Sequence, residues 1–402
     1  MTRTVGVSTA IPSSADPFDA GPFVRLRAPH AALPLGTSSV GRRALIVTAV
    51  AWVPLVVLAA AQGYALRDAP RESLLLDFSA YARYLVAVPL LVLAEAVCLP
   101  RLALIARHFG AAGFVADADR PRYDELIAAT RRSLHSRRAG MVIVLVAYAA
   151  TLALGRSMGA IPYADTASTW AAPVVDGTRS LSLAGMWRGV VSQPLLLVLL
   201  GAWLWRLALW TRFLRGVARL DLRLVPAHPD LAGGLLFVST SLPPFIVLAF
   251  ALGAWMAGGV LDAVLYDARS PREFVAVVLV LVLLVLVLCA GPLLTLAGAL
   301  RRARLRGAFE YGRIAAALGR GFEERWVESA TAVDAEALGA PDFSATTDLF
   351  SVAANVRKMR IVPLDIAGVL SLVAATLLPF IPVLLIALPI EQLLRYVGKL
   401  LL

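Results

Sequence analysis

The sequence predicts an all-α protein: a bundle of about seven transmembrane helices, within a range of six to eight, that carries a cytosolic helical segment. The plainest observation is the uncharged run of residues 274–300, FVAVVLVLVLLVLVLCAGPLLTLAGAL. A helix of about 20 apolar residues crosses the roughly 30 Å hydrocarbon core of a bilayer, and six further runs have the same character. The composition agrees, since 59% of the 402 residues are hydrophobic and only 16% are charged, against roughly 25% charged residues in soluble domains.

These runs divide the chain into four parts. Residues 1–43 form a polar N-terminal tail that we expect in the cytosol, and residues 44–300 form a bundle of six spans. Residues 301–362 form the cytosolic helical segment, and residues 363–402 hold a last, proline-broken membrane segment and the C-terminal tail. The expected spans, taken from windows of about 19 residues, are 44–63, 83–106, 139–157, 188–212, 235–266, 274–300 and 364–390.

The distribution of basic residues predicts the orientation. The tail, the connection 107–138, the connection around Arg219 and the segment after residue 300 are rich in arginine, whereas the connections between them carry few basic residues. Positive charge marks the cytoplasmic side of a membrane protein, so we expect a multi-pass protein of the bacterial cytoplasmic (inner) membrane with its N-terminus in the cytosol. The last segment, which either crosses fully or is re-entrant, is interrupted by Pro379, Pro382 and Pro389.

The net charge of +11 does not predict a nucleic-acid partner, because the basic residues lie between apolar runs rather than in one basic domain. The expected partner is the lipid bilayer, together with a candidate protein partner at the cytosolic helices. Cys98 and Cys289 both fall inside apolar runs, so no disulfide framework is expected. The sequence holds no Cys/His spacing typical of a metal site and no GxSxG, HExxH, Walker or GxGxxG motif. We therefore expect no metal, no cofactor and no enzymatic activity.

The cytosolic segment is expected to form two helices, 303–328 and 345–360. In the first, apolar residues recur about every four positions, which is typical of an amphipathic helix. The two helices either pack on the cytoplasmic ends of the bundle, which is the interpretation that we favour, or serve as a membrane-surface or partner-docking element. The recurring apolar residues are Phe309, Ile314, Leu318, Phe322 and Trp326.

Two ionisable residues fall inside apolar runs, where such groups are rare and point to a functional site. Glu95 lies about halfway along the run 83–106, and Arg206 lies in the inner half of the run 188–212. Counting back from the cytoplasmic ends places both at similar depth, and an unpaired charge in hydrocarbon costs several kcal/mol. We therefore expect an ion pair. The pair is either static, with Arg206 reaching toward the interface, or it makes Glu95 a proton or cation site; we favour the static alternative.

The connection RLVPAHPDLAGGLLF concentrates residue types with special chemistry. His228 is a histidine, a residue type that can change charge within the physiological pH range or ligate a metal, and Gly233 with Gly234 provides a hinge or a close approach between backbones. Alternatively, Pro229 and Asp230 simply start a helix, with Asp230 as its cap or as a first-turn acid. One histidine and one aspartate do not make a metal site, but the density of these residues makes the loop the best polar candidate in the chain.

Proline interrupts nearly every apolar run. Such breaks free backbone groups that must be buried in protein or line a cavity, and interrupted helices form the binding sites of transporters. In the run 235–266, three hydroxyl residues lead into two prolines, and the hydroxyls either satisfy freed carbonyls or coordinate an ion. Because proline is common in membrane helices, we favour a structural role. The residues are Ser239, Thr240, Ser241, Pro243 and Pro244.

Four segments resemble a bacterial family of polytopic membrane proteins that carries an HPDxAGGL loop motif and has no known activity. They are HPDLAGGL at 228–235, EYGRIAAALGRGFEERW at 310–326, DLFSVAANVRKMRIVPLD at 348–365 and the ending LPFIPVLLIALPIEQLL. The resemblance implies membrane residence and no particular site residue. No similarity is visible between the first three spans and the next three.

Together these features predict an integral membrane protein. The leading expectation is passage or transport of a small solute or ion through a bundle with proline-broken helices. The alternative is a non-transporting scaffold or sensor that docks a partner through helices 303–328 and 345–360. A transporter should show a polar cavity that reaches Glu95 or the Pro243–Pro244 break, whereas a scaffold should show a dry bundle and an exposed apolar patch on the cytosolic helices.

Overall fold

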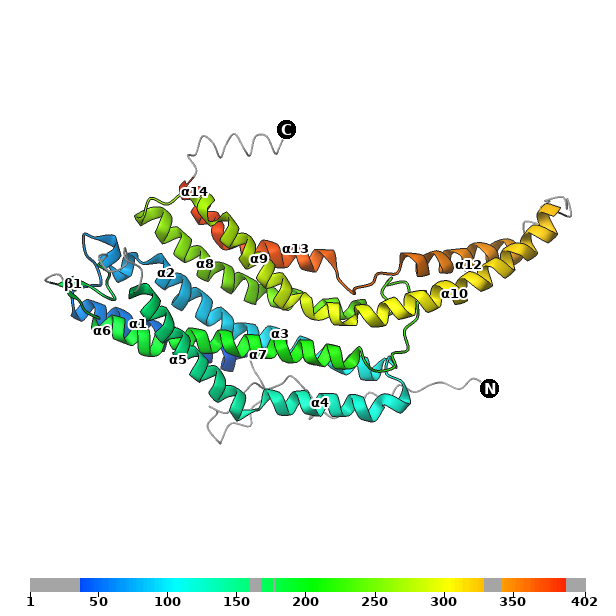
Figure 1. Cartoon of the computed structure of the whole chain (residues 1–402), viewed down its shortest axis with the longest axis horizontal. Helices are drawn as coiled ribbons and strands as arrows, with labels where there is room; N and C mark the ends of the chain where they lie inside the picture. Colours follow the sequence, from blue (N-terminus) through cyan, green and yellow to red (C-terminus); the bar gives the residue numbers. More distant parts are fainter. Residues whose placement is uncertain (1–36, 160–167, 176–177, 329–340, 388–402) are drawn as a thin grey trace.

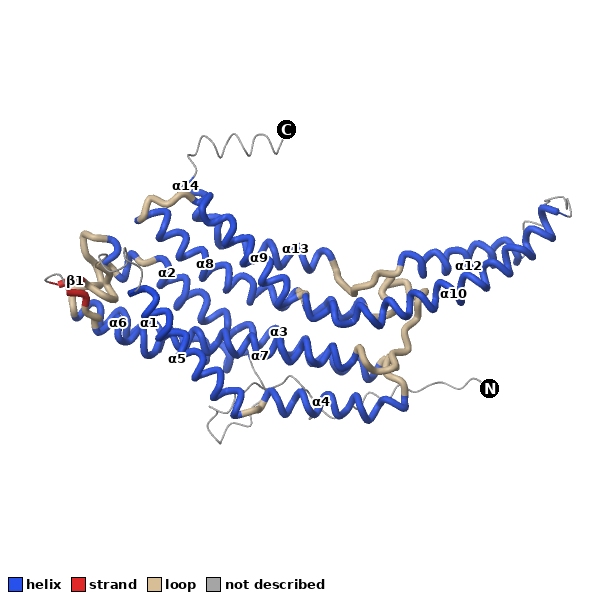
Figure 2. Tube along the Cα trace, in the orientation of Figure 1, coloured by secondary structure: helices blue, strands red, loops and turns tan. Residues whose placement is uncertain are grey.

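A computed structural model describes residues 37–159, 168–175, 178–328 and 341–387. This part of the chain is almost entirely helical, with one two-stranded hairpin (Figure 2), so the predicted all-α class is confirmed. The long helices lie along the long axis of the molecule (Figure 1). The elements are α1 Thr37–Ala61, α2 Phe78–Tyr81, α3 Val88–Ala111, α4 Arg120–Leu134, α5 Arg137–Gly159, β1 Val174–Val175, β2 Thr178–Arg179, α6 Leu183–Trp187, α7 Gln193–Val217, α8 Ile246–Tyr266, α9 Val275–Cys289, α10 Ala297–Phe322, α12 Pro341–Lys358, α13 Ile366–Leu377 and α14 Ile381–Ala387.

Within the described residues, seven helical stretches are long and apolar enough to cross a membrane, so the chain is a multi-pass integral membrane protein. Each stretch coincides with one predicted span. Two of them pass through a π-helix: one, Ala82–Ala87, joins α2 to α3, and a second, Arg188–Ser192, joins α6 to α7. The stretches are Val40–Ala61, Phe78–Ala111, Arg137–Gly155, Leu183–Val217, Leu236–Tyr266, Pro271–Cys289 and Ile366–Ile386.

Several helix boundaries differ from the predicted ones. α1 begins at Thr37, so the last residues of the expected tail are helical, while residues 1–36 lie outside the described part of the chain. The sixth span ends at Cys289, because Gly291 and Pro292 open a 3₁₀ stretch before α10 begins. The last segment continues as helix through Pro379 and is long enough to cross; the third proline expected to break it lies outside the described residues.

Two of the seven stretches are longer than a bilayer requires. At 1.5 Å per residue, the 34 residues of Phe78–Ala111 and the 35 of Leu183–Val217 each reach about 50 Å, against a hydrocarbon core of roughly 30 Å. The connection that follows α1 contacts the start of both stretches. The backbone N–H of Leu74, just before the first stretch, donates to the carbonyl of Tyr64, and that of Leu183, the first residue of the second stretch, donates to the side chain of Gln62. The excess length therefore protrudes at the opposite end, where α1 and α5 begin (Figure 1). Arginine is concentrated there, and we call it the arginine-rich end.

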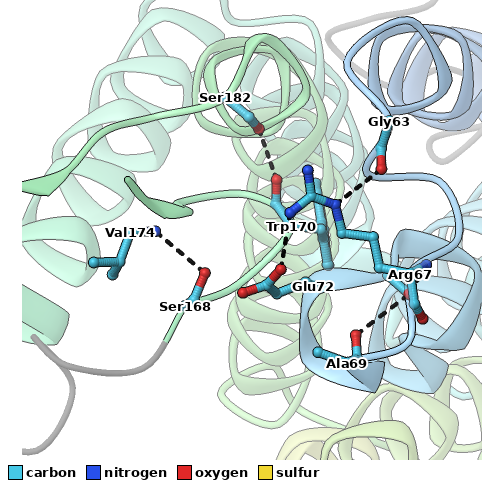
Figure 3. A network of polar contacts seen from close by, with 9 residues as sticks. Gly63, Arg67, Ala69, Glu72, Ser168, Trp170, Val174 and Ser182 are labelled. Atoms are coloured by element: carbon cyan, nitrogen blue, oxygen red, sulfur yellow. Dashed lines mark hydrogen bonds and ion pairs between the residues drawn. The ribbon is translucent and has the colours of Figure 1, made fainter. Parts of the chain in front are cut away.

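At the arginine-poor end, two connections interlock (Figure 3). The guanidinium of Arg67 lies 3.0 Å from the carboxylate of Glu72. Hydrogen bonds from Ser168 and then from Arg67 lower the pKa of the Glu72 carboxyl. The hydroxyl of Ser182 donates to the carbonyl of Trp170 at 2.8 Å. These contacts tie the connection after α1 to the connection between α5 and α6.

The two long stretches repeat one another. Each starts at a polar N-cap, Asp77 or Ser182, whose side chain accepts a hydrogen bond from the backbone three residues later. Each then passes through a short α-helix and a π-helix into a long α-helix, which begins at Val88 or Gln193, so the caps and the long helices share an offset of 105 residues. At that offset the identical residues are Arg83 and Arg188, Val86 and Val191, Pro89 and Pro194, Leu90 and Leu195, Leu91 and Leu196, Leu99 and Leu204, Arg101 and Arg206, Leu102 and Leu207, Ala103 and Ala208, Leu104 and Leu209, and Arg107 and Arg212.

The helices that precede these stretches match as well. Arg-Arg-Ala lies near the start of α1, at 42–44, and opens α5, at 137–139. α1 packs against α3, and α5 packs against α7. The chain therefore contains two copies of one helical hairpin, which run in the same direction; we call them the first hairpin (α1–α3) and the second hairpin (α5–α7).

Glycine permits close packing of α8 against its neighbours. A Cβ atom on Gly253 would collide with the carbonyl oxygen of Thr376 in α13, and one on Gly258 would collide with Ala82. Membrane helices associate through small residues of this kind, because lipid supplies no hydrophobic drive between them. α8 thus joins the first hairpin to the last span.

α10 and α12 form an antiparallel pair that projects beyond the bundle at the arginine-rich end (Figure 1). At the base of this projecting hairpin, Gly307 faces Val356 of α12 and Pro226 of the connection before α8, and further out Gly319 lies against Phe350. The two predicted cytosolic helices are both present, but they pack on each other instead of covering the end of the bundle. The first one starts at Ala297, earlier than predicted.

Candidate functional site

The predicted pair of Glu95 and Arg206 forms. One carboxylate oxygen of Glu95 lies 2.7 Å from Nη2 of Arg206, and the other lies 2.9 Å from Nη2 of Arg43. Glu95 is 8% exposed and Arg206 is 2% exposed. The cluster therefore links α1, α3 and α7 through one enclosed carboxylate. Arg43 was missed from the sequence because the arginines before the first span were weighed only as signs of orientation.

The surroundings of this cluster hold it in place. The indole N–H of Trp203 donates to the carbonyl of Leu91 at 2.8 Å, and the guanidinium of Arg206 lies 5.2 Å from the Trp203 ring centre, within the range of a cation–π interaction. Within the described part of the chain, Nε of Arg206 has no hydrogen-bond partner. Because both oxygens of Glu95 are occupied by guanidinium groups, the geometry favours a static clamp over a proton or cation site.

The depth of the cluster differs from the expectation. The sequence predicted Glu95 near the middle of its span, yet its partner Arg43 lies in the first turns of α1. The helix that carries Glu95 protrudes at this end, so the middle of the helix is not the middle of the bilayer crossing. The clamp therefore lies near the arginine-rich face of the hydrocarbon core.

The break before α8 is satisfied within the protein. Two 3₁₀ stretches, Leu236–Ser241 and Pro243–Phe245, replace the first turns of the helix. The two prolines, Pro243 and Pro244, carry no N–H, and Nε of Arg101 donates to the carbonyl of Thr240 at 3.2 Å. The side-chain hydroxyls donate to carbonyls three residues earlier, at 2.7 Å from Ser239, 2.6 Å from Thr240 and 2.8 Å from Ser241.

The HPDLAGGL loop is built around the Asp230 carboxylate. One of its oxygens accepts from the backbone N–H groups of Ala232 and Gly234 at 2.8 and 3.0 Å, and the other accepts from Leu236 at 3.0 Å. Partial burial alone would raise the pKa of Asp230, but these backbone bonds and the imidazole of His228 outweigh it, so the pKa lies below its ordinary value. No helix starts at Asp230, as the alternative expected: the 3₁₀ stretch Leu236–Ser241 begins six residues later with Leu235 as its N-cap, and Asp230 instead folds the loop through these backbone N–H groups.

The glycines of this loop are required by backbone geometry. Gly233 and Gly234 have φ angles of +63° and +93°, which glycine adopts without strain. A Cβ on Gly234 would lie 2.7 Å from the Phe114 ring, and one on Gly233 would lie 2.9 Å from Met359. The atoms that these Cβ atoms would meet belong to side chains, so the loop backbone approaches neighbouring side chains closely rather than another backbone. Nδ1 of His228 lies 2.8 Å from the Asp230 carboxylate.

The predicted residues do not assemble into one site. They occupy three places: the Glu95 clamp, the Asp230 loop and the break at Ser239–Pro244. Among the described residues, no three histidine, cysteine, aspartate or glutamate side chains are grouped so that they could hold a metal ion. Two cavities are prominent, and none of the predicted site residues lines either of them. One, of 620 Å³, lies between α4, α5 and α7, and the other, of 270 Å³, lies between α10 and the connection after α7.

The projecting hairpin has an exposed apolar pair, of which the sequence analysis named Phe309 but not Leu305. Leu305 and Phe309 lie one turn apart on α10 and are 52% and 79% exposed. They lie on the face of α10 opposite Ala303 and Gly307, which are buried at the base of the hairpin. The charged residues around this pair are mostly basic, with Glu310 beside Phe309 as the acidic exception; the basic ones are Arg301, Arg302, Arg304, Arg306 and Arg313.

Comparison of the chain with models of known protein families, with curated proteins and with solved structures finds no match. The resemblance to the family that carries the HPDxAGGL motif therefore stays a prediction.

Proposed function

We propose that the protein is a membrane-anchored docking protein whose projecting hairpin binds a cytosolic protein partner. The observation that carries the proposal is the exposed pair Leu305–Phe309. Contiguous apolar surface that is not covered by lipid or by the protein's own fold marks an interaction site. A partner with an apolar anchor and acidic flanks fits this surface, because arginines surround the pair.

Lipid does not cover this surface. The uncharged run of the sixth span ends at Leu300, and at 1.5 Å per residue the helical path from there to Phe309 is about 14 Å long. α10 continues along the long axis of the molecule, away from the bundle (Figure 1). Phe309 therefore lies beyond the reach of the headgroup region.

The orientation of the hairpin follows from charge. Arginine is concentrated at the end where the hairpin projects, and the positive-inside rule assigns that end to the cytosol. We extend the proposal accordingly: the N-terminus and the hairpin face the cytosol of a bacterial cell, and the protein resides in its cytoplasmic membrane. A reporter that works only in the cytosol should be active when it is inserted within residues 329–340, and one that works only outside the cytosol should be inactive there. The opposite result would overturn the assignment.

The interior of the bundle supports docking over passage. The Glu95 clamp is enclosed, the hydroxyls at 239–241 are engaged with carbonyls, and neither prominent cavity is lined by these residues. These are the features that we set out above for a scaffold.

The test uses cysteine labelling of the surface. Cys98 and Cys289 are buried, so a Phe309→Cys variant presents one accessible thiol on the hairpin, and Glu310→Cys gives a matched control on the adjacent face. In inverted native membranes, a water-soluble maleimide should label F309C severalfold more slowly than E310C. After peripheral proteins are stripped with carbonate, the two rates should become alike. Equal labelling in native membranes would refute docking at this surface.

A second function, transport of a small solute or ion, is favoured by one specific observation. The first and second hairpins are repeats that run in the same direction, and parallel repeats are one of the architectures of secondary transporters. Both copies also contain a π-helix at the same position, and π-helical turns are frequent at functional sites. Flux of protons or small ions into proteoliposomes, compared between the wild type and Glu95→Gln, tests this candidate. If proteoliposomes with the wild-type protein show no more flux than vesicles without protein, the result would argue against transport.

A further inference from the structure

The 620 Å³ cavity lies at the elbow where α4 ends and α5 begins, against α7. Its lining combines two guanidinium groups, two hydroxyls, an indole and small or branched apolar side chains. The residues are Ala129, Arg132, Ser133, Ser136, Arg138, Ala139, Val142, Ile143 and Trp205. This mixture is basic at one side and apolar at the other.

The two arginines are exposed, and no described acidic side chain neutralises their positive charge. Neither Arg132 nor Arg138 makes a hydrogen bond or an ion pair with another described residue. The polar groups beside them are tied to the backbone instead: Trp205 donates to the Ser133 carbonyl at 3.3 Å, and the Ser136 hydroxyl accepts from a backbone N–H of α5 at 3.3 Å. The cavity therefore presents two free guanidinium groups on a fixed frame.

The internal repeat explains why one of these arginines is free. In the first hairpin, Arg43 of the Arg-Arg-Ala sequence is bound by Glu95. Its counterpart in the second hairpin is Arg138, and the residue at the position of Glu95 is Leu200. The second copy keeps the arginine and lacks the carboxylate, so an anion from outside the chain can take its place.

The cavity lies at the plane where the hydrocarbon core begins. The membrane-spanning stretch of α5 starts at Arg137, and the next turns leave Met141, Val142 and Leu145 exposed on the outside of the bundle. Val142 and Ile143 line the cavity on this side, so its apolar wall continues the lipid-facing surface of α5. Tryptophan is enriched at this level of membrane proteins.

We propose that this cavity binds the headgroup phosphate of an anionic phospholipid, with an acyl chain lying along Val142 on α5. Phosphate is recognised by paired guanidinium groups, and basic pockets between helices at the cytoplasmic face bind lipid headgroups. The apolar wall selects a lipid over a free phosphate, which has no chain to place there. The site does not depend on the docking proposal, since it uses other helices.

The experiment measures lipid binding to the purified full-length protein by native mass spectrometry, with phosphatidylglycerol, phosphatidylcholine and glycerol phosphate as separate ligands. Phosphatidylglycerol should bind the wild type tightest. Removing both arginines, in Arg132→Gln/Arg138→Gln, should weaken it by about thirtyfold, as expected for two basic residues near a membrane surface. The control Arg212→Gln/Arg219→Gln removes the same charge from the same end and should change binding by less than about twofold.

A second variant tests the argument from the repeat. Leu200→Glu places the missing carboxylate where the first hairpin has Glu95, and it should abolish the preference for phosphatidylglycerol while Leu200→Gln retains it. Two results would overturn the proposal: unchanged phosphatidylglycerol binding in the double-arginine variant, or glycerol phosphate that binds the wild type as tightly as the lipid. The second result would assign the cavity to a soluble phosphate.

Discussion

Arg101 and Arg206 occupy the same position in two copies of one helical hairpin, and each guanidinium binds a group outside its own copy. Arg101 donates to the Thr240 carbonyl at 3.2 Å, where prolines interrupt the helix before α8. Arg206 lies 2.7 Å from Glu95 in the other hairpin. The duplicated arginine therefore links the hairpins to each other and to the rest of the bundle.

Glu95→Gln should destabilise the protein. The substitution leaves Arg206 buried and without a charged partner, and breaking a buried pair from one side costs about 3 kcal/mol or more. Thermal unfolding in detergent, followed by tryptophan fluorescence, should show a clearly lower midpoint. The double variant Glu95→Leu/Arg206→Met removes both charges and should recover much of the lost thermal stability. A Glu95→Gln protein as stable as the wild type would show that the clamp does not contribute to stability.

The contribution of Asp230 should depend on pH. Its folded-state pKa lies below the ordinary value of about 4, so the carboxylate stabilises the folded state fully above that value, and the contribution is lost as the pH falls through the folded-state pKa. Asp230→Ala should cost about 1–3 kcal/mol of unfolding free energy at pH 7, because three backbone N–H groups of the loop lose a charged acceptor. Measured at pH 3, the gap between variant and wild type should narrow. A gap that is constant across this range would contradict the assigned role.

Two glycine substitutions should act in opposite directions. Gly234→Ala forces a Cβ to within 2.7 Å of the Phe114 ring at a φ of +93°, so it should destabilise the protein by about 1–3 kcal/mol. Gly312 lies in α10, where a Cβ would meet nothing within 4 Å, and Gly312→Ala should stabilise the helix by up to about 1 kcal/mol. Thermal midpoints of both variants, in the same detergent, check the sign of each effect. A stabilised Gly234→Ala protein would refute the close packing of this loop.

The sequence predicted the helices well because long apolar runs have one stable form in a bilayer. It missed their true lengths. Arg83 is the first residue of the apolar window 83–106, and Arg107 is the residue just after it. The helical stretch nevertheless continues past both arginines, from Phe78 to Ala111. A hydropathy window detects the part of a helix that lies in lipid, and it ends where the helix enters water.

The candidate site was predicted in part. The depth argument paired Glu95 with Arg206 correctly, but it could not find Arg43, whose position depends on how α1 packs against α3. The repeat is visible when the sequence is aligned with itself at an offset of 105 residues. It is not visible when the first three spans are aligned with the next three. The unit is a hairpin of two spans, so the matching residues of Phe78–Ala111 and Leu183–Val217 fell in different places within the two triplets.

Photo-crosslinking in living cells tests the docking surface itself. A photoreactive phenylalanine analogue at position 309 replaces an aromatic side chain that is 79% exposed. The same analogue at position 311 is the control, because it replaces Tyr311, an aromatic side chain two residues away that is less exposed. We expect one discrete intermolecular product from position 309, none from position 311, and loss of the product when Arg301 and Arg302 are changed to glutamate. Identical behaviour of the two positions, or no product from position 309, would contradict a partner on this face of α10.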